Sequence, residues 1–238
     1  MTRAVPPDVT PVPEIVCEGD TDRVVYETLS RRGLMPMLTA YPKKGESLGG
    51  ISPQTDRIRA LVNLGRTRLM VARDLDDATD GSALLRNLVH DLGSGAIAVS
   101  EQAPFLVQLG DCRIALLPQG LPDAPLLNRH SVGKHAIDDY LLALLEQSVG
   151  ERPALFKNED DRDRAFGKMD EVRRLMASQG FTVNTSKRLV FLLKAIVNYG
   201  VSDGTLARQR IEAAPAETVR QVFQPLIDTV NAAVQVLP

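Results

Sequence analysis

The chain has 238 residues, 44% of them hydrophobic and 24% charged, which suits one large domain or a domain with an appendage and excludes a disordered, collagenous or coiled-coil protein. Its two cysteines, Cys17 and Cys112, are too few for an all-cysteine zinc site. The formal net charge of −2 argues against a surface coated with basic side chains for nucleic acid.

The first segment, residues 1–12, is rich in proline and is expected to form a tail. It contains no apolar stretch of signal-peptide length, and nowhere in the chain do about 18 apolar residues follow one another. We therefore expect a cytoplasmic protein that has no membrane segment and keeps its cysteines reduced.

Predicted strands and helices alternate from residue 13 to about residue 120. The expected strands are EIVC (14–17), MPMLTAY (35–41), RLMVA (68–72) and AIAVS (96–100), followed by a hairpin of FLVQLG and CRIALLP. Helical periods cover residues 20–33, 54–66 and 80–93. This alternation predicts βαβ units, and hence an α/β fold with a mostly parallel sheet flanked by helices.

After residue 120 the periodicity is helical only. It covers 134–150, 159–180, 186–200 and two more segments that end at Val236. The expected organisation is a tail at 1–12, an α/β domain at 13–120 and a helical C-terminal region at 121–238.

Acidic residues follow two of the predicted strands. Glu18 ends the first in the sequence CEGDTD, with Asp22 one helical turn further on, and Asp74 and Asp76 end the strand LMVA in RDLDD. Ligands of open parallel sheets bind beyond the carboxyl ends of the strands. Carboxylates gathered there repel one another, and a hard divalent cation, Mg²⁺ or Mn²⁺, offsets that repulsion.

A purely structural interpretation of these acids is also open. Asp20 could cap the helix that follows it, and Asp76, Asp77 and Asp80 could be loop and capping acids. Either motif alone favours this interpretation, whereas the two motifs together are more specific.

The two motifs together resemble the TOPRIM domain, in which an apolar strand ends in E-G and a later apolar strand ends in D-x-D. Here these are EIVCEGDTD and LMVARDLDD, and the resemblance covers residues 13–118. It implies a TOPRIM-like, Rossmann-like sheet. The extra acid Asp22 resembles the OLD-type nuclease branch of that superfamily.

A third motif agrees with the OLD-type branch. HAIDDYLLALL is similar to a helical segment of small OLD-like proteins, in which Asp138 takes the place of a family glutamate. The shorter side chain leaves a structural alternative open, because an acid in the first turn of a helix is also favoured by the helix dipole.

The resemblance implies a metal-dependent nuclease that acts on DNA or RNA. Glu18, Asp22, Asp74, Asp76 and Asp138 would hold one or two Mg²⁺ or Mn²⁺ ions, with Glu18, Asp74 and Asp76 as the catalytic residues. Glu18 could instead be the general acid or base, as its counterpart is in TOPRIM strand-transfer enzymes.

A basic stretch between residues 181 and 211 could bind the phosphates. Its cations are Lys187, Arg188, Lys194, Arg208 and Arg210. Residues 151–238 hold 13 Lys and Arg against 11 Asp and Glu, so the overall charge hides an uneven distribution. The alternative is a solvated helix face beside an apolar stripe.

Several partners and functions remain open. The sequence contains no P-loop motif, so an OLD-like protein would act alone or with a separately encoded ATPase, as a defence-system effector does. The other candidates are an RNA-processing nuclease and, from a different class, a non-catalytic TOPRIM module that binds nucleic acid or a protein. The resemblance is also compatible with a homodimer.

Overall fold

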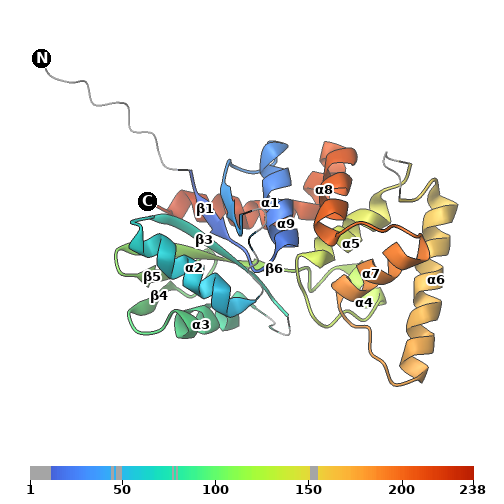
Figure 1. Ribbon diagram of the computed structural model, residues 1–238, viewed down its shortest axis with the longest axis horizontal. Coiled ribbons are helices and arrows are strands. Elements are labelled where there is room, and N and C mark those ends of the chain that lie inside the picture. Colours follow the sequence, from blue (N-terminus) through green and yellow to red (C-terminus); the bar gives the residue numbers. More distant parts are fainter. Residues whose placement is uncertain (1–11, 44–45, 47–49, 77, 79, 151–154) are drawn as a thin grey trace, which may run out of the picture.

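The computed structural model describes residues 12–43, 46, 50–76, 78, 80–150 and 155–238 (Figure 1). Most of the predicted tail and Asp77 lie outside these residues. The strands are β1 (Glu14–Val16), β2 (Thr39–Tyr41), β3 (Arg68–Asp74), β4 (Ala96–Ser100), β5 (Phe105–Leu109) and β6 (Cys112–Gln119). The helices are α1 (Asp20–Arg31), α2 (Ile51–Asn63), α3 (Gly81–Leu92), α4 (Pro125–Arg129), α5 (Asp138–Gln147), α6 (Glu159–Ser178), α7 (Ser186–Ile196), α8 (Asp203–Ala213) and α9 (Ala216–Val236).

The strands form one sheet in the order β2-β1-β3-β6-β5-β4. The pairs β1–β2, β1–β3 and β3–β6 are parallel, while β4–β5 and β5–β6 are antiparallel. The predicted α/β class, the mostly parallel sheet, the terminal hairpin and the helical C-terminal part are therefore confirmed. The second strand is shorter than predicted, and the short helix α4 was not predicted.

Alternating side chains of the sheet enter two different cores. Val16, Leu69 and Val71 pack with α2 and α3 on one face. Ile15, Met70 and Ala72 belong to a larger core on the other face, which α1 covers. Because β1 and β3 bury both faces, the middle of β3 is the apolar run LMVA, and the charged side chains lie toward the ends of the two strands.

The helical C-terminal region shares that larger core. Val222, Leu226 and Val230 of α9 and Leu206 of α8 belong to the same buried cluster as Ile15 of β1. In Figure 1, α9 extends back to the sheet, whereas α4, α5, α6 and α7 lie beyond the end of the strands. The boundary near residue 120 is therefore not a boundary between two hydrophobic cores.

Two absences can be stated for the part of the chain that the structure describes. None of its helices is long and apolar enough to cross a membrane. Cys17 and Cys112 are both buried and form no disulfide.

Gly120 is the residue at which the chain leaves the sheet, and its backbone has a conformation that favours glycine. Its φ is +138°, and an added Cβ would lie 2.6 Å from Cβ of His135. We expect Gly120→Ala to lower the free energy of unfolding by about 2 kcal/mol, measured by chemical denaturation.

Gly167 provides the matched control for that substitution. It lies inside α6, where an added Cβ would meet nothing within 4 Å, so Gly167→Ala should raise the free energy of unfolding by about 0.5–1 kcal/mol. Equal effects of the two substitutions would contradict the geometry around Gly120.

Candidate active site

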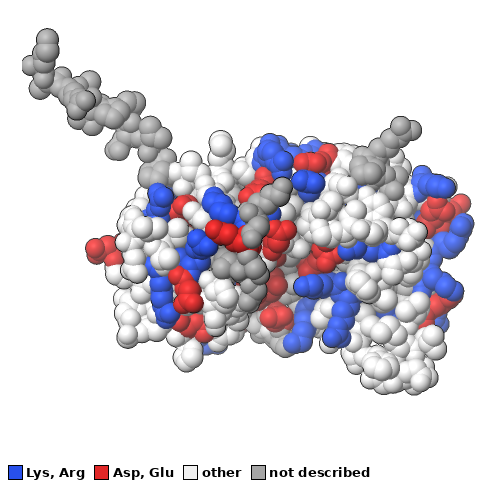
Figure 2. Space-filling view, in the orientation of Figure 1, with Lys and Arg blue, Asp and Glu red and all other residues white. Residues whose placement is uncertain are grey.

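A cavity of about 470 Å³ lies where the carboxyl ends of β1 and β3 meet the helical region. Six acids and two lysines line it: Glu18, Asp20, Asp22, Asp74, Asp76, Asp138, Lys134 and Lys187. We call this the acidic cavity. Figure 2 shows acidic side chains in the middle of this face of the molecule, with basic side chains beside them. All five predicted metal ligands line it, so the structure brings together residues that are up to 120 positions apart.

Glu18 and Asp22 follow β1. Gly19 precedes the first turn of α1, and its backbone N–H donates to Oδ2 of Asp22 at 2.9 Å. Asp22 is 5% exposed, and burial raises its pKa to about 7, with Asp138 and Glu18 adding to the rise. Burial also raises the pKa of Glu18, against the opposing charge of Arg73.

Asp74 is the last residue of β3 and connects the sheet to α5. Its Oδ1 accepts a hydrogen bond from the backbone N–H of Ile137 at 3.2 Å, at the start of that helix. Burial, together with the charges of Asp22 and Glu18, raises the pKa of Asp74 to about 9. The two sides of the cavity are thus joined through one carboxylate.

Asp76 reaches the acidic cavity in a way that strand alternation did not predict. Its φ is +49°, and its backbone pairs with His135, with N–O distances of 2.8 and 3.0 Å. The side chain is exposed. Asp80, in contrast, caps α3 by accepting from the backbone N–H groups of Ser82 and Ala83, so the capping interpretation is confirmed for that acid.

Two adjacent acids of α5 have different environments. Asp138 lines the acidic cavity, and its Oδ1 is buried without a hydrogen-bond partner among the described residues. Burial and Asp203 raise its pKa to about 6, while Lys187 and Lys194 oppose the rise. Asp139 is fully buried, and its carboxylate is hydrogen-bonded to Leu121 N, His135 Nδ1 and Ser186 Oγ. Asp138 is therefore the acid available to a ligand.

The predicted basic residues separate into different environments. Lys187 lines the acidic cavity, and Arg188 and Arg208 are exposed. Lys194 lies 2.6 Å from Asp203 in an ion pair. Arg210 is 1% exposed, so its placement on a phosphate-binding surface was wrong. Its position on the inner face of α8, where Leu206, Ala207 and Ile211 are also buried, accounts for the difference.

A buried polar network beneath the acidic cavity was not predicted. Nε2 of Gln54 donates to the backbone oxygens of Val16 and Ala72, at 3.1 and 2.8 Å, and so bridges β1 and β3 just before their acids. Its Oε1 accepts from Nε of Arg73, whose Nη1 pairs with Asp91 at 2.7 Å. The signal was an arginine directly after the apolar run LMVA, where a buried guanidinium requires partners. Lys134 was missed too, although it lies four residues before Asp138.

Comparisons with known proteins bear on the fold alone. No protein-family model matches the chain, nor does any curated protein. A solved structure, the hypothetical protein PH0156 from Pyrococcus horikoshii OT3, is similar over 94% of this chain and 98% of that chain, with a TM-score of 0.56 and 15% sequence identity. Because the similarity spans both the sheet and the helical region, these two parts occur together in both structures.

Removing the Gln54 bridge should destabilise the protein. We expect Gln54→Ala to lower the free energy of unfolding by about 2–4 kcal/mol, because it removes buried hydrogen bonds from Nε of Arg73 and from two backbone oxygens. The measurement is chemical denaturation, with the exposed Gln102→Ala as the control. A loss no larger than that of Gln102→Ala would contradict this role.

The raised pKa values of Asp22 and Asp74 set the pH dependence of stability in EDTA. Their ordinary value is 3.8, so folding takes up protons between that pH and about 9. The contribution of these two carboxyls to the stability of the folded state is complete at acid pH, where both are protonated, and is lost as the pH rises. We expect Tm to fall by at least about 3 °C between pH 5 and pH 8, a change that corresponds to about 1 kcal/mol.

The Asp74→Asn variant isolates the contribution of this group. It should lose a large part of the pH dependence, whereas the exposed Asp228→Asn should retain it. A Tm profile of Asp74→Asn with the slope of the unmodified protein would contradict the electrostatic description.

Proposed function

We propose that this chain is a Mg²⁺-dependent nuclease of the OLD-like TOPRIM type, which hydrolyses phosphodiester bonds in DNA or RNA. The observation that carries the proposal is the convergence of acids from β1, α1, β3 and α5 on the acidic cavity. A cavity with six carboxylates and two lysines is costly to keep without cations and suits a metal ion together with a phosphate.

The donor chemistry of the acidic cavity fits Mg²⁺ or Mn²⁺. Its charged donors are carboxylate oxygens, and the unpartnered Oδ1 of Asp138 is an acceptor in need of a cation or a proton. No three His, Cys, Asp or Glu side chains within the described ranges lie around one point as a metal site. Mg²⁺ commonly uses only one or two carboxylates and completes its shell with water and phosphate oxygens.

Separate roles follow for the residues of the acidic cavity. Glu18, Asp22, Asp74, Asp76 and Asp138 would be the acids from which one or two metal ions take their carboxylate ligands. When bound, Mg²⁺ would supply charge neutralisation at the phosphate and a more acidic water. The hydrogen bond from Ile137 fixes the orientation of Asp74. Alternatively, Glu18, whose pKa is raised by burial, would be the general acid or base instead of a metal ligand. Lys187, at the start of α7, can pair with a phosphate oxygen.

A non-catalytic TOPRIM module is the second candidate. It is favoured by the structural hydrogen bonds of two acids, because Asp22 accepts from Gly19 and Asp74 accepts from Ile137. In such a module the acids would shape the loop after β1 and the start of α5, and nucleic acid or a protein would bind without being cleaved. An RNA-processing nuclease remains an alternative within the enzyme class.

The proposed partners extend beyond the substrate. With no P-loop in its sequence, the protein would work alone or under the control of a separately encoded ATPase, as in a defence system. Recovery of an ATPase in a pull-down from the native host would support the second arrangement. A homodimer is also proposed, and sedimentation would test it.

Neutralising two acids of β3 and its following loop tests the nuclease proposal. We expect Asp74→Asn combined with Asp76→Asn to reduce metal-dependent cleavage at least about a hundredfold, because both residues would hold the metal. The assay incubates the protein with plasmid, single-stranded DNA and total RNA in Mg²⁺, Mn²⁺ or EDTA.

The matched control neutralises two exposed acids away from the acidic cavity, in Asp111→Asn combined with Asp228→Asn, and should leave cleavage unchanged. Cleavage by the Asp74 and Asp76 double variant at the unmodified rate would overturn the proposal. Binding of nucleic acid without cleavage in every metal would support the module instead.

A further inference from the structure

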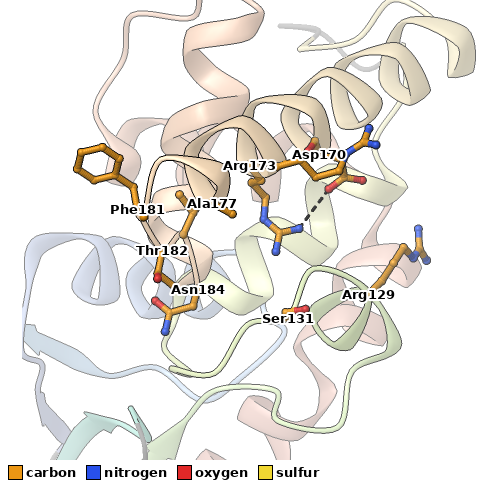
Figure 3. Close-up of a pocket in the computed structure, with 11 residues that line it drawn as sticks. Arg129, Ser131, Asp170, Arg173, Ala177, Phe181, Thr182 and Asn184 are labelled. Carbon is orange, nitrogen blue, oxygen red and sulfur yellow. Dashed lines mark hydrogen bonds and ion pairs between the residues drawn. The ribbon is translucent and has the colours of Figure 1, made fainter.

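A second cavity, of about 570 Å³, lies among the end of α4, the C-terminal half of α6 and the segment that leads into α7 (Figure 3). It is lined mainly by basic and small polar residues: Arg129, Ser131, Asp170, Arg173, Arg174, Ala177, Gly180, Phe181, Thr182, Val183 and Asn184. We call this the arginine cavity. None of its residues belongs to the acidic cavity.

Three arginines and one acid, Asp170, line the arginine cavity, so its lining residues carry a net positive charge. Arg173 donates to Oδ1 of Asp170 at 3.2 Å and to the backbone oxygen of His130, which holds its guanidinium between α6 and the end of α4. Arg129 and Arg174 are exposed. Arg129 pairs with Glu146 at 3.1 Å, a surface ion pair of low strength. A multiply charged anion is the ligand that this arrangement favours.

The two cavities adjoin each other along one pair of adjacent segments. Gly133 N–H donates to Asn184 O at 3.0 Å, and Lys134 forms a parallel bridge with Thr185. Ser131 and Asn184 line the arginine cavity, whereas Lys134 and Lys187 line the acidic one. Asn184 lines the arginine cavity and the next residue, Thr185, lines the acidic one, so an anionic polymer of only a few repeating units would reach from one cavity to the other.

An exposed aromatic side chain stands at the edge of the arginine cavity. Phe181 is 63% exposed, and in Figure 3 its ring points outward at the side opposite Arg129. An exposed phenyl ring has no role in the core, but it offers a flat surface on which an unpaired base can stack. Arginines next to such a ring are typical of surfaces that bind single strands.

We propose that the arginine cavity binds the phosphodiester backbone of a single-stranded nucleic acid, a few nucleotides from the phosphate at the acidic cavity, with one base stacked on Phe181. This inference rests on the proposed nuclease function and adds a binding subsite to it. Arg129 and Arg174 contact phosphates, and the anchored Arg173 fixes the position of the backbone.

Fluorescence anisotropy in EDTA tests the subsite without requiring cleavage. The probes are fluorescein-labelled oligothymidylate and oligouridylate of about 12 nucleotides, titrated over a range of salt concentrations. Arg129→Gln combined with Arg174→Gln should raise Kd about tenfold and reduce the slope of log Kd against log salt by about 1.4, twice the 0.7 expected for each phosphate contact. Phe181→Ala should raise Kd about tenfold and leave that slope unchanged.

The chain offers matched controls for each variant. Arg164 lies on α6 as well, is exposed and pairs with Asp161 at 3.6 Å, and Arg220 has the same kind of pair with Glu217 on α9. Arg164→Gln combined with Arg220→Gln removes the same charge elsewhere and should leave Kd nearly unchanged. Phe191 is 64% exposed, so Phe191→Ala is the control for Phe181→Ala.

Three results would overturn this inference. They are an unmodified protein that binds neither probe, cavity variants that bind as it does, and control variants that weaken binding as much as the cavity variants do. Capture of polyglutamate in preference to the oligonucleotides would assign the arginine cavity to an acidic polypeptide and overturn the inference too.

Binding through this cavity without any cleavage would leave the inference standing and remove the nuclease proposal. Cleavage with an unchanged Kd and salt slope in the cavity variants would leave the nuclease proposal standing and remove this inference.

Discussion

The withdrawal of carboxylates from water at the acidic cavity, together with their mutual repulsion, is the constraint on which the rest of this structure depends. Glu18, Asp22, Asp74 and Asp138 face one cavity, and burial raises the pKa of each of them. Groups with raised pKa values make the folded state less stable at neutral pH, so the fold must hold these acids in place by other means. Such an arrangement persists where a function requires concentrated negative charge.

The stabilising interactions surround the acidic cavity on every side. Beneath it, Gln54 ties the backbones of β1 and β3 together and is itself held by Arg73. Beside it, the start of α5 presents a backbone N–H to Asp74, and Lys187 lowers the pKa of Asp22 and of Asp138. The polar groups that stabilise the acids thus come from both the sheet and the helical region.

Periodicity and strand-end chemistry predicted most of the fold and the acids of the site. Alternation of strands and helices is a local property, and both faces of β3 are buried, so RLMVA was recognisable as a central strand. Glu18 and Asp74 could be placed together because parallel strands share a carboxyl edge. The resemblance to a known family added Asp138, which lies more than sixty residues beyond Asp74.

The environments of the charged residues that the sequence could not predict depend on packing between elements that are far apart in the chain. Whether Arg210 faces solvent or the core depends on which side of α8 meets α1, and a charged helix face does not encode that choice. Lys194 appeared free in the sequence because Asp203, its partner, lies on a different helix. Asp76 reaches the acidic cavity through a backbone pairing with His135, a contact across 59 positions.

The distribution of charge explains how a chain of formal charge −2 can still be suited to a nucleic acid. Six carboxylates concentrate at one cavity and three arginines at its neighbour, so the average over the whole molecule describes neither place. Electrostatic attraction falls off over about 8 Å at physiological salt, which makes the local charge the one that a phosphate experiences. Cations in the acidic cavity would remove its repulsion, and the arginine cavity would then add attraction along the same path. Two adjacent cavities of opposite charge can in this way bind a polyanion that neither the net charge nor either cavity alone would predict.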